Sequence, residues 1–171
     1  MSAEPNYRNV GDVARAWWED LRPRDRRPGD RAGLAELRRS ADPLDLAFVP
    51  AFGRLRLALG AHEAGAILRA ARIAHVLAHV RDNDSRPVAR ALGPQADGDA
   101  PMSEARFRRL LQAADDEDLI RRMVRAVKML KQRANVADLA EALWFWNDRV
   151  RRDWAFRYLN AEPPADDRGA A

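Results

Sequence analysis

Basic side chains recur at helical spacing in the last third of the chain, and a row of such groups suits binding to phosphates. Arg121, Arg125 and Lys128 are three or four residues apart, so they share one face of a helix. Between Leu119 and Tyr158, ten basic residues stand against four acidic ones. Such an excess leaves a positive field that attracts polyanions and predicts a nucleic-acid-binding surface. The alternative is that these stripes are the solvated faces of amphipathic helices.

A different chemistry is suggested by His75 and His79, which are four residues apart and would project from one side of a helix. This is the spacing of a helical metal pair, and Asp82 and Asp84 follow as candidate oxygen ligands. The glutamate that a zinc protease places between its histidines is absent. Partly buried histidines are common on long helices, so a metal-dependent enzyme using His75 and His79 is kept only as an alternative.

Acidic residues cluster from Asp115 to Asp118, where two carboxylates could act as general acid and base. Four acids at the start of a helix are expected instead to cap it and to complement the positive end of its dipole. The sequence contains no phosphate-binding glycine loop, nucleophile elbow or informative serine, histidine and carboxylate set. An enzyme is therefore the less favoured class.

The composition is that of a soluble globular protein. The 171 residues are 47% hydrophobic and 33% charged, and the net charge of +4 with an isoelectric point near 10.2 favours an anionic partner. Cysteine is absent, which excludes disulfides and cysteine-bound zinc. No apolar run reaches the length of a membrane span, and MSAEPNYRNV lacks the features of a secretion signal. We expect a cytoplasmic protein without a membrane partner.

Helices are the elements that would position these side chains. Capping residues and helix breakers predict a first helix that starts at Asp12 and ends by Pro23, a second that follows Asp30, a long one from His62 to Val80, and one capped by Ser103. No strand-like alternation or internal repeat stands out. The predicted fold class is all-α, a multi-helix bundle with a basic surface.

Apolar spacing assigns a buried face to several of these helices. Trp17 and Trp18 are assigned to the core, because two large aromatic residues in an amphipathic helix are usually packed. Three further sets are expected to be buried. They are Phe48, Phe52, Leu55 and Leu59 around Pro50; Leu119, Met123, Val127 and Leu130; and Leu139, Leu143, Trp146, Val150 and Trp154 on one helical face.

Three regions are predicted along the chain. Residues 1–11 are a flexible lead-in, residues 12–159 a single helical domain, and residues 160–171 a polar, proline-containing disordered tail. The stretch 81–101 is rich in Pro, Gly, Asp, Asn and Ser, so it is predicted to be the one long irregular connection, where the domain could subdivide. Residues 90–92 are expected to form a short anchored turn within it.

Several motifs occur together in the order that one known family has. They are AWWEDL, GDRAGLAELRR, VPAF, ARALG, SEARFRRLL, the MLK segment and WNDRVRRDWAFRY. With these motifs, which lie within residues 16–158, the chain resembles the small subunit of the type I-E CRISPR Cascade complex, the CasB family. The resemblance implies an all-helical, non-catalytic subunit with no cofactor.

The resemblance also implies partners and site residues. The family's subunit is present as a pair along the belly of the complex, beside other Cascade subunits, and it stabilises the guide crRNA paired with target DNA and the displaced non-target strand. Its basic positions, carried over residue by residue, imply nine nucleic-acid-binding residues. They are Arg38 and Arg39, Arg106 and Arg109, Arg125 and Lys128, and Arg149, Arg151 and Arg152.

The chain departs from the family's pattern at one place. The family often has a glycine before the ARAL-like segment, where this chain has Val88 and Ala89, so Arg90 is a weaker candidate.

A stand-alone helical regulator that binds nucleic acid is the other alternative to this function. The helix-turn-helix spacing that such a regulator would need is not seen.

Overall fold

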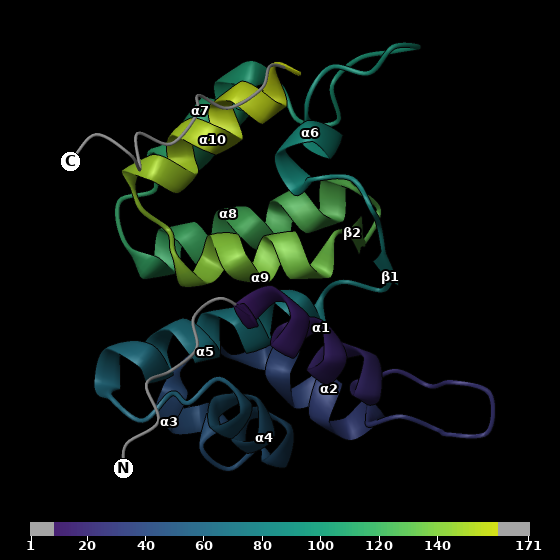
Figure 1. The fold of residues 1–171 in the computed structure, drawn as a ribbon, viewed down its shortest axis with the longest axis vertical. Coiled ribbons are helices and arrows are strands. Elements are labelled where there is room, and N and C mark those ends of the chain that lie inside the picture. Colours follow the sequence, from purple (N-terminus) through teal and green to yellow (C-terminus); the bar gives the residue numbers. More distant parts are fainter. Residues whose placement is uncertain (1–8, 161–171) are drawn as a thin grey trace.

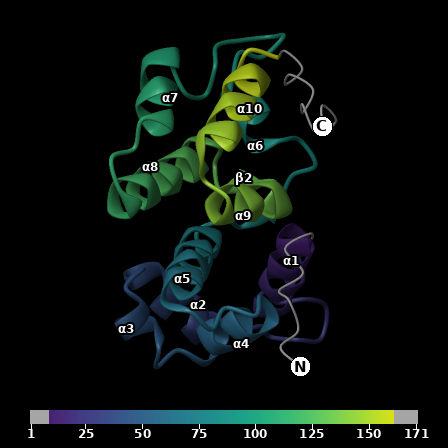
Figure 2. The same cartoon turned by 60° about the vertical axis from the view of Figure 1, so that its left-hand side comes forward.

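The chain folds into helices stacked in layers (Figures 1 and 2). In this computed structural model, which describes residues 9–160, α7 and α10 lie above α8 and α9, these lie above α1 and α5, and α2, α3 and α4 form the base. The predicted all-α class is confirmed. The helices are α1 Val10–Leu21, α2 Arg31–Arg39, α3 Pro43–Leu46, α4 Pro50–Ala58, α5 Ala64–Ala78, α6 Val88–Leu92, α7 Glu104–Leu111, α8 Asp116–Met129, α9 Val136–Trp144 and α10 Asp148–Tyr158.

One short pair of strands joins the segment after α5 to the segment after α8. β1 (Asp82–Asn83) follows α5 and pairs in parallel with β2 (Arg133–Ala134), which follows α8. The backbone NH of Asp84 extends the pairing by donating to the carbonyl oxygen of Ala134 at 3.0 Å. Because α6, α7 and α8 lie between the strands in sequence, the pair fixes the end of α8 beside the end of α5.

Side-chain caps begin most of the longer helices. The side chains of Asp30, Ser103 and Asp115 each accept a hydrogen bond from a backbone NH three residues further on, as predicted. Asn135 and Asn147 do the same for α9 and α10. These bonds satisfy NH groups that the first helical turn leaves without partners. The acidic cluster before α8 thus has a capping role.

Trp17 and Trp18 belong to the core, as predicted, and are only 7% and 6% exposed. Each indole N–H donates to a main-chain carbonyl of a distant segment. Trp17 bonds to Ala51 at 2.8 Å, and Trp18 bonds to Val80 at 3.1 Å. The two side chains therefore fix α1 to α4 and to the end of α5.

The first helix begins at Val10 and not at Asp12, so the predicted boundary is wrong. Tertiary packing is the reason, because α1 packs closely against α9. A Cβ atom on Gly11 would lie 2.9 Å from the carbonyl oxygen of Ala137, so only a glycine allows this approach without a shift. Asp12 lies in the first turn, where its charge complements the helix dipole.

The set predicted to be buried around Pro50 is correct except at Phe48, which is 82% exposed. α3 ends at Leu46 and α4 begins at Pro50, so the helical spacing does not continue across this break. In the set predicted to be buried on α8, Leu119, Met123 and Val127 are buried. Leu130, which follows the last residue of α8, is half-buried.

The apolar set from Leu139 to Trp154 spans two helices, which corrects the prediction of one helical face. The chain turns between α9 and α10, where the side chain of Asn147 accepts from the backbone NH of Val150. Trp146 lies in this turn and is half-buried, as is Val150. The helical spacing of apolar residues in α9 therefore does not continue into α10, which begins at Asp148.

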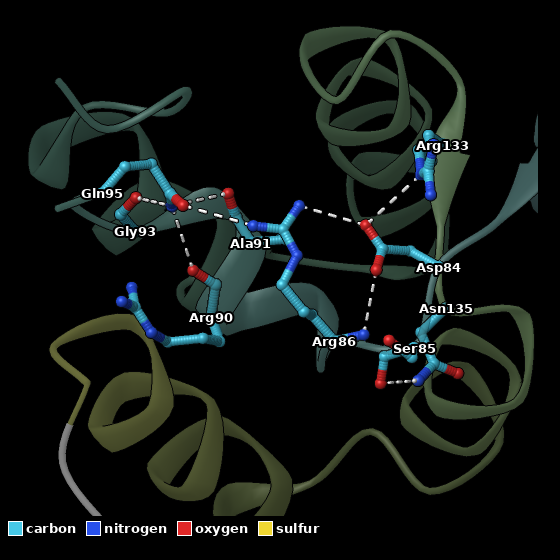
Figure 3. A network of polar contacts seen from close by, with 9 residues as sticks. All are labelled: Asp84, Ser85, Arg86, Arg90, Ala91, Gly93, Gln95, Arg133 and Asn135. Carbon is cyan, nitrogen blue, oxygen red and sulfur yellow. Dashed lines mark hydrogen bonds and ion pairs between the residues drawn. The ribbon is translucent and has the colours of Figure 1, made fainter. Parts of the chain in front are cut away.

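The connection 81–101 is more regular than predicted, because it contains β1 and α6. Figure 3 shows polar contacts that fix it. The carboxylate of Asp84 accepts from the backbone NH and from the guanidinium of Arg86, both at 3.0 Å. Arg133 Nε lies 3.7 Å from the same carboxylate, and Asn135 donates to the carbonyl oxygen of Ser85. Charge-assisted bonds thus fix the start of the connection to β2.

Arg90 lies in α6 and stabilises the turn that follows it. Its guanidinium donates to the carbonyl oxygen of Pro94 at 2.6 Å. The side-chain amide of Gln95 donates to the carbonyl oxygen of Gly93 at 2.6 Å (Figure 3). The anchored turn expected at residues 90–92 is therefore part of a helix. These contacts give Arg90 a structural role.

The predicted division into lead-in, single domain and tail stays a prediction. Residues 1–8 and 161–171 lie outside the described part of the chain. Within residues 9–160, no helix is both long and apolar enough to cross a membrane.

We predict that Gly93→Ala lowers the free energy of unfolding by about 1–3 kcal/mol or more, because α10 would have to move. A Cβ atom at Gly93 would collide with the carbonyl oxygen of Tyr158, so backbone meets backbone there. Gly98→Ala is the matched control, since no atom lies within 4 Å of its Cβ position. Urea denaturation measures both variants, and equal stabilities would contradict this account of the packing.

Candidate nucleic-acid interface

A groove between α7 and α8 gathers arginine side chains from both helices. Its volume is about 280 Å³, and three apolar residues, Met102, Leu110 and Met129, form part of its lining. The rest of the lining is basic. It consists of Arg106 and Arg109 from α7 and Arg122 and Arg125 from α8.

Three of these four arginines carry no ion pair within the described residues. Only Arg122 is paired, through a 2.8 Å contact between its Nε and a carboxylate oxygen of Asp118. This hydrogen bond is the main reason why the pKa of Asp118 is lowered to about 2. No acid lines the groove, so the charges of the other three arginines are available to an anion such as a phosphate.

The basic excess seen in the sequence is partly neutralised by the fold. Between Leu119 and Tyr158, at least five of the ten basic residues form ion pairs with acids, and in four of these pairs the carboxylate side chain is less than 20% exposed. The positive charge of these five is thus neutralised within the fold. They are Arg121, Arg122, Arg133, Arg151 and Arg157.

A second basic cluster lies where α2 and α8 meet the C-terminal end of α5. The Nε of Arg38 donates to the carbonyl oxygen of Ala78 at 2.8 Å. The terminal amino groups of Arg38 have no partner among the described residues. The pKa of His79 is lowered to about 4, first by burial and then by the charges of His75, Lys128 and Arg38. Arg38 of α2 and Lys128 of α8 thus both act electrostatically on the imidazole of His79.

The groove and this cluster adjoin along α8. Arg125 and Lys128 are three residues apart on that helix, so their side chains are neighbours on its surface. Both are exposed, and neither has an ion pair within residues 9–160. Five of the nine predicted residues are therefore brought together. We call Arg38, Arg106, Arg109, Arg125 and Lys128 the basic face.

The other four predicted residues are not part of the basic face. Arg39 is exposed in the last turn of α2, next to Arg38. Arg149 lines a different groove, between α9 and α10, where acids also contribute. Arg151 pairs with Asp148 at 3.2 Å on its own helix, and Arg152 is exposed on α10. The α10 arginines are therefore not part of the groove that Arg125 lines.

His75 and His79 do not form the metal pair that was considered. The Nδ1 atom of His75 lies 2.8 Å from the carbonyl oxygen of Leu37 and 3.0 Å from that of Ser40, so it donates to the end of α2. Nowhere in residues 9–160 do three or more metal-binding side chains gather. Nothing in this geometry favours a metal-dependent enzyme.

Sequence reasoning did not select Arg22, which belongs to the second cluster. Its guanidinium carbon lies 5.2 Å from the centre of the Trp18 ring. Its pKa is lowered, first by burial and next by the charge of Arg38. The only signal in the sequence was the arginine-rich loop that Arg22 begins, and this does not distinguish it from Arg24.

Comparison with known proteins identifies the family. Residues 33–159 match the family model described as CRISPR-associated protein Cse2. The chain belongs to the Cse2 family. This confirms the relationship indicated by the motifs, since CasB is the same family.

The Cse2 fold is also present in a solved complex. One chain in the crystal structure of E. coli Cascade bound to a PAM-containing double-stranded DNA target matches this chain with a TM-score of 0.65. The two are 21% identical, and the match covers 92% of this chain and 97% of the other. At this identity the match shows a shared fold. A search of curated proteins found no match.

We predict that His79→Gln reduces the loss of stability between pH 6.5 and pH 4. The unfolded chain takes up a proton on His79 near pH 6.5, whereas the folded protein does so only near pH 4. The stabilisation of the folded state by neutral His79 is therefore complete above pH 6.5, and it is lost as the pH falls through 4. Thermal melting across this range measures it. His62→Gln, at an exposed histidine, is the control, and parallel curves for all three proteins would disprove the assignment.

Proposed function

We propose that this Cse2 chain is the small, non-catalytic subunit of a type I-E Cascade surveillance complex in antiviral defence. In this role it contacts the backbones of the guide crRNA, the paired target strand and the displaced non-target strand. Its partners are the other Cascade subunits, these three strands and a second copy of itself. The Cse2 family membership and the fold shared with a chain of E. coli Cascade support this role.

The basic face is the observation that carries the proposal. Arg106, Arg109 and Arg125 stand around one groove with no carboxylate in its lining, and Lys128 continues the row along α8. Guanidinium groups bind phosphate oxygens through two parallel hydrogen bonds, which positions a strand without reading its bases. This suits a subunit that must hold any guide and target sequence.

The energetics favour an effect on the open complex. Forming the RNA–DNA heteroduplex roughly balances the loss of the DNA duplex, so added contacts to the backbones can tip the equilibrium. A well-formed charge-assisted hydrogen bond contributes about 1.5–3 kcal/mol, and less when it is exposed. Several cations acting together therefore prolong the open state, while a single one has a small effect.

A stand-alone regulator is less well supported. Sequence-specific regulators present a short recognition helix to base edges. Here the cations come from three helices, α2, α7 and α8, and not from one protruding helix. Only cations of α7 and α8 line the groove. The arrangement is better suited to backbone contacts than to base readout.

We predict that the isolated protein binds single-stranded and duplex nucleic acid with log affinity that falls linearly with log salt, because bound phosphates release counterions. The triple variant Arg106→Ala, Arg109→Ala, Arg125→Ala should lose affinity and reduce the slope by about two to three. A control of equal charge is Arg15→Ala, Arg24→Ala, Arg54→Ala, whose arginines pair with Glu19 or Asp30. A flat salt response, or equal losses in both variants, would overturn the proposal.

We predict that the assembled complex with Arg106, Arg109, Arg125 and Lys128 all changed to alanine loads guide RNA normally but holds the R-loop for a shorter time. The cause would be fewer contacts to the strand backbones after pairing has begun. Lifetimes of open complexes on duplex target, measured over a salt series, test this. Lifetimes equal to those of the parent complex would show that these residues are an ordinary solvated surface.

A further inference from the structure

A further concave site lies at the opposite end of α8 from β2, between α5, the start of α8 and the turn that joins α9 to α10. The start of α8 and this turn are at the left of Figure 1. The volume of the site is about 520 Å³, which is within the range of small-ligand sites. Leu68, Arg69 and Arg72 line it from α5, Trp144 from the end of α9, and Phe145 and Trp146 from the turn; Asp116, an acid at the start of α8, also lines it. We call Leu68, Arg69, Arg72, Trp144, Phe145 and Trp146 the aromatic pocket. None of them belongs to the basic face.

One exposed aromatic ring, that of Phe145 between two packed tryptophans, gives the pocket a stacking surface. Phe145 is 37% exposed, and Leu68 beside it is 48% exposed, so apolar surface faces solvent here. Trp146 packs edge-on against the buried Trp154, with ring centres 5.4 Å apart, which holds the indole in place. The platform is therefore fixed from behind by the core.

The pocket is also rich in hydrogen-bond donors. The guanidinium of Arg69 stacks over Trp144, 4.8 Å from the ring centre, which orients its N–H groups. Arg72 is 93% buried and pairs with Asp116 through NH1, but its Nε has no hydrogen-bond partner. The indole Nε1 of Trp146 is likewise buried without one. Unsatisfied buried donors are uncommon. Both atoms are buried in the unbound protein, so an acceptor reaches them only when the side chains around them shift.

We propose that the aromatic pocket binds an unpaired nucleobase of a nucleic-acid strand. The base stacks against Phe145 and offers ring nitrogens or carbonyl oxygens to the donors of Arg72 and Trp146, while Arg69 contacts the adjoining phosphate. Stacking on aromatic side chains together with arginine contacts is the general mode by which proteins bind single strands. This inference rests on the proposed function, because it assigns the unpaired part of the strands to a site of its own.

The donor content favours a base over an apolar protein segment. An aliphatic peptide would cover Leu68 and Phe145 but would leave the two buried N–H groups without partners. A free phosphate would use the arginines and not the rings. A planar group with acceptors on its edge and a phosphate beside it uses both.

The test compares two probes that share a phosphate backbone, a short oligothymidylate and an abasic oligodeoxynucleotide of the same length. We expect the full-length protein to bind oligothymidylate about tenfold more tightly, as one stacked base would give. Phe145→Ala should reduce that ratio to near one and leave abasic binding unchanged. Phe156→Ala is the matched control, because Phe156 is 38% exposed on α10 and lies outside the pocket lining.

A cross-linking experiment shows where on the protein the oligonucleotide binds. An oligonucleotide carrying 5-iododeoxyuridine should cross-link on irradiation to the tryptic peptide Ala134–Arg149, which contains the three aromatic residues. Equal binding of both probes by the parent protein would overturn this inference and leave the proposed function intact, with a protein segment as the remaining occupant of the pocket. Failure to bind either probe would overturn both. A thermal melt of Phe145→Ala confirms that the variant is folded.

Discussion

The C-terminal end of α5 is the constraint on which the rest of the fold depends. The last carbonyl groups of a helix have no partners within it, and here three different elements supply them. Arg38 of α2 bonds to Ala78, Trp18 of α1 to Val80, and Gln132 after α8 to His79. One helix end thus fixes both halves of the molecule. The cost is an unusual backbone at Gln132, where φ is +63°.

This arrangement couples folding to charge. Arg38 uses one N–H group for the helix end and keeps its terminal amino groups for an anion, so its side chain is positioned before any ligand arrives. Burial first, and then the charges of His75, Lys128 and Arg38, lower the pKa of His79 to about 4 and so favour its neutral form. A phosphate placed there would relieve the repulsion between these charges. The basic face is thus a site of uncompensated charge that the fold holds together.

The arginines of this chain divide into two groups by the carboxylates near them. Asp118 and Asp84 each bind two arginines, and their pKa values are lowered as a result. Those arginines stabilise local structure, such as the start of the connection after α5. In the α7/α8 groove, Arg106, Arg109 and Arg125 have no ion pair within residues 9–160, so their charge is not neutralised there. Counting charges along the sequence cannot separate the two groups, because pairing depends on which helices meet.

The sequence by itself determined the helical class, the caps at Asp30, Ser103 and Asp115, and the burial of the tandem tryptophans. These depend on local hydrogen bonding and on apolar spacing within single helices. Its motifs also indicated the family.

Only the tertiary structure decided where α1 begins, that Phe48 is exposed, and that the last apolar set spans two helices. It also separated Arg125 and Lys128 from Arg149 and Arg151, and it assigned Arg22 to a cluster with Arg38. The physical reason is that close approach at Gly11, the turn at Asn147 and the pairing of each arginine depend on contacts between segments far apart in the chain. Helical spacing describes one face of one helix, and it carries no information about which other helix that face meets.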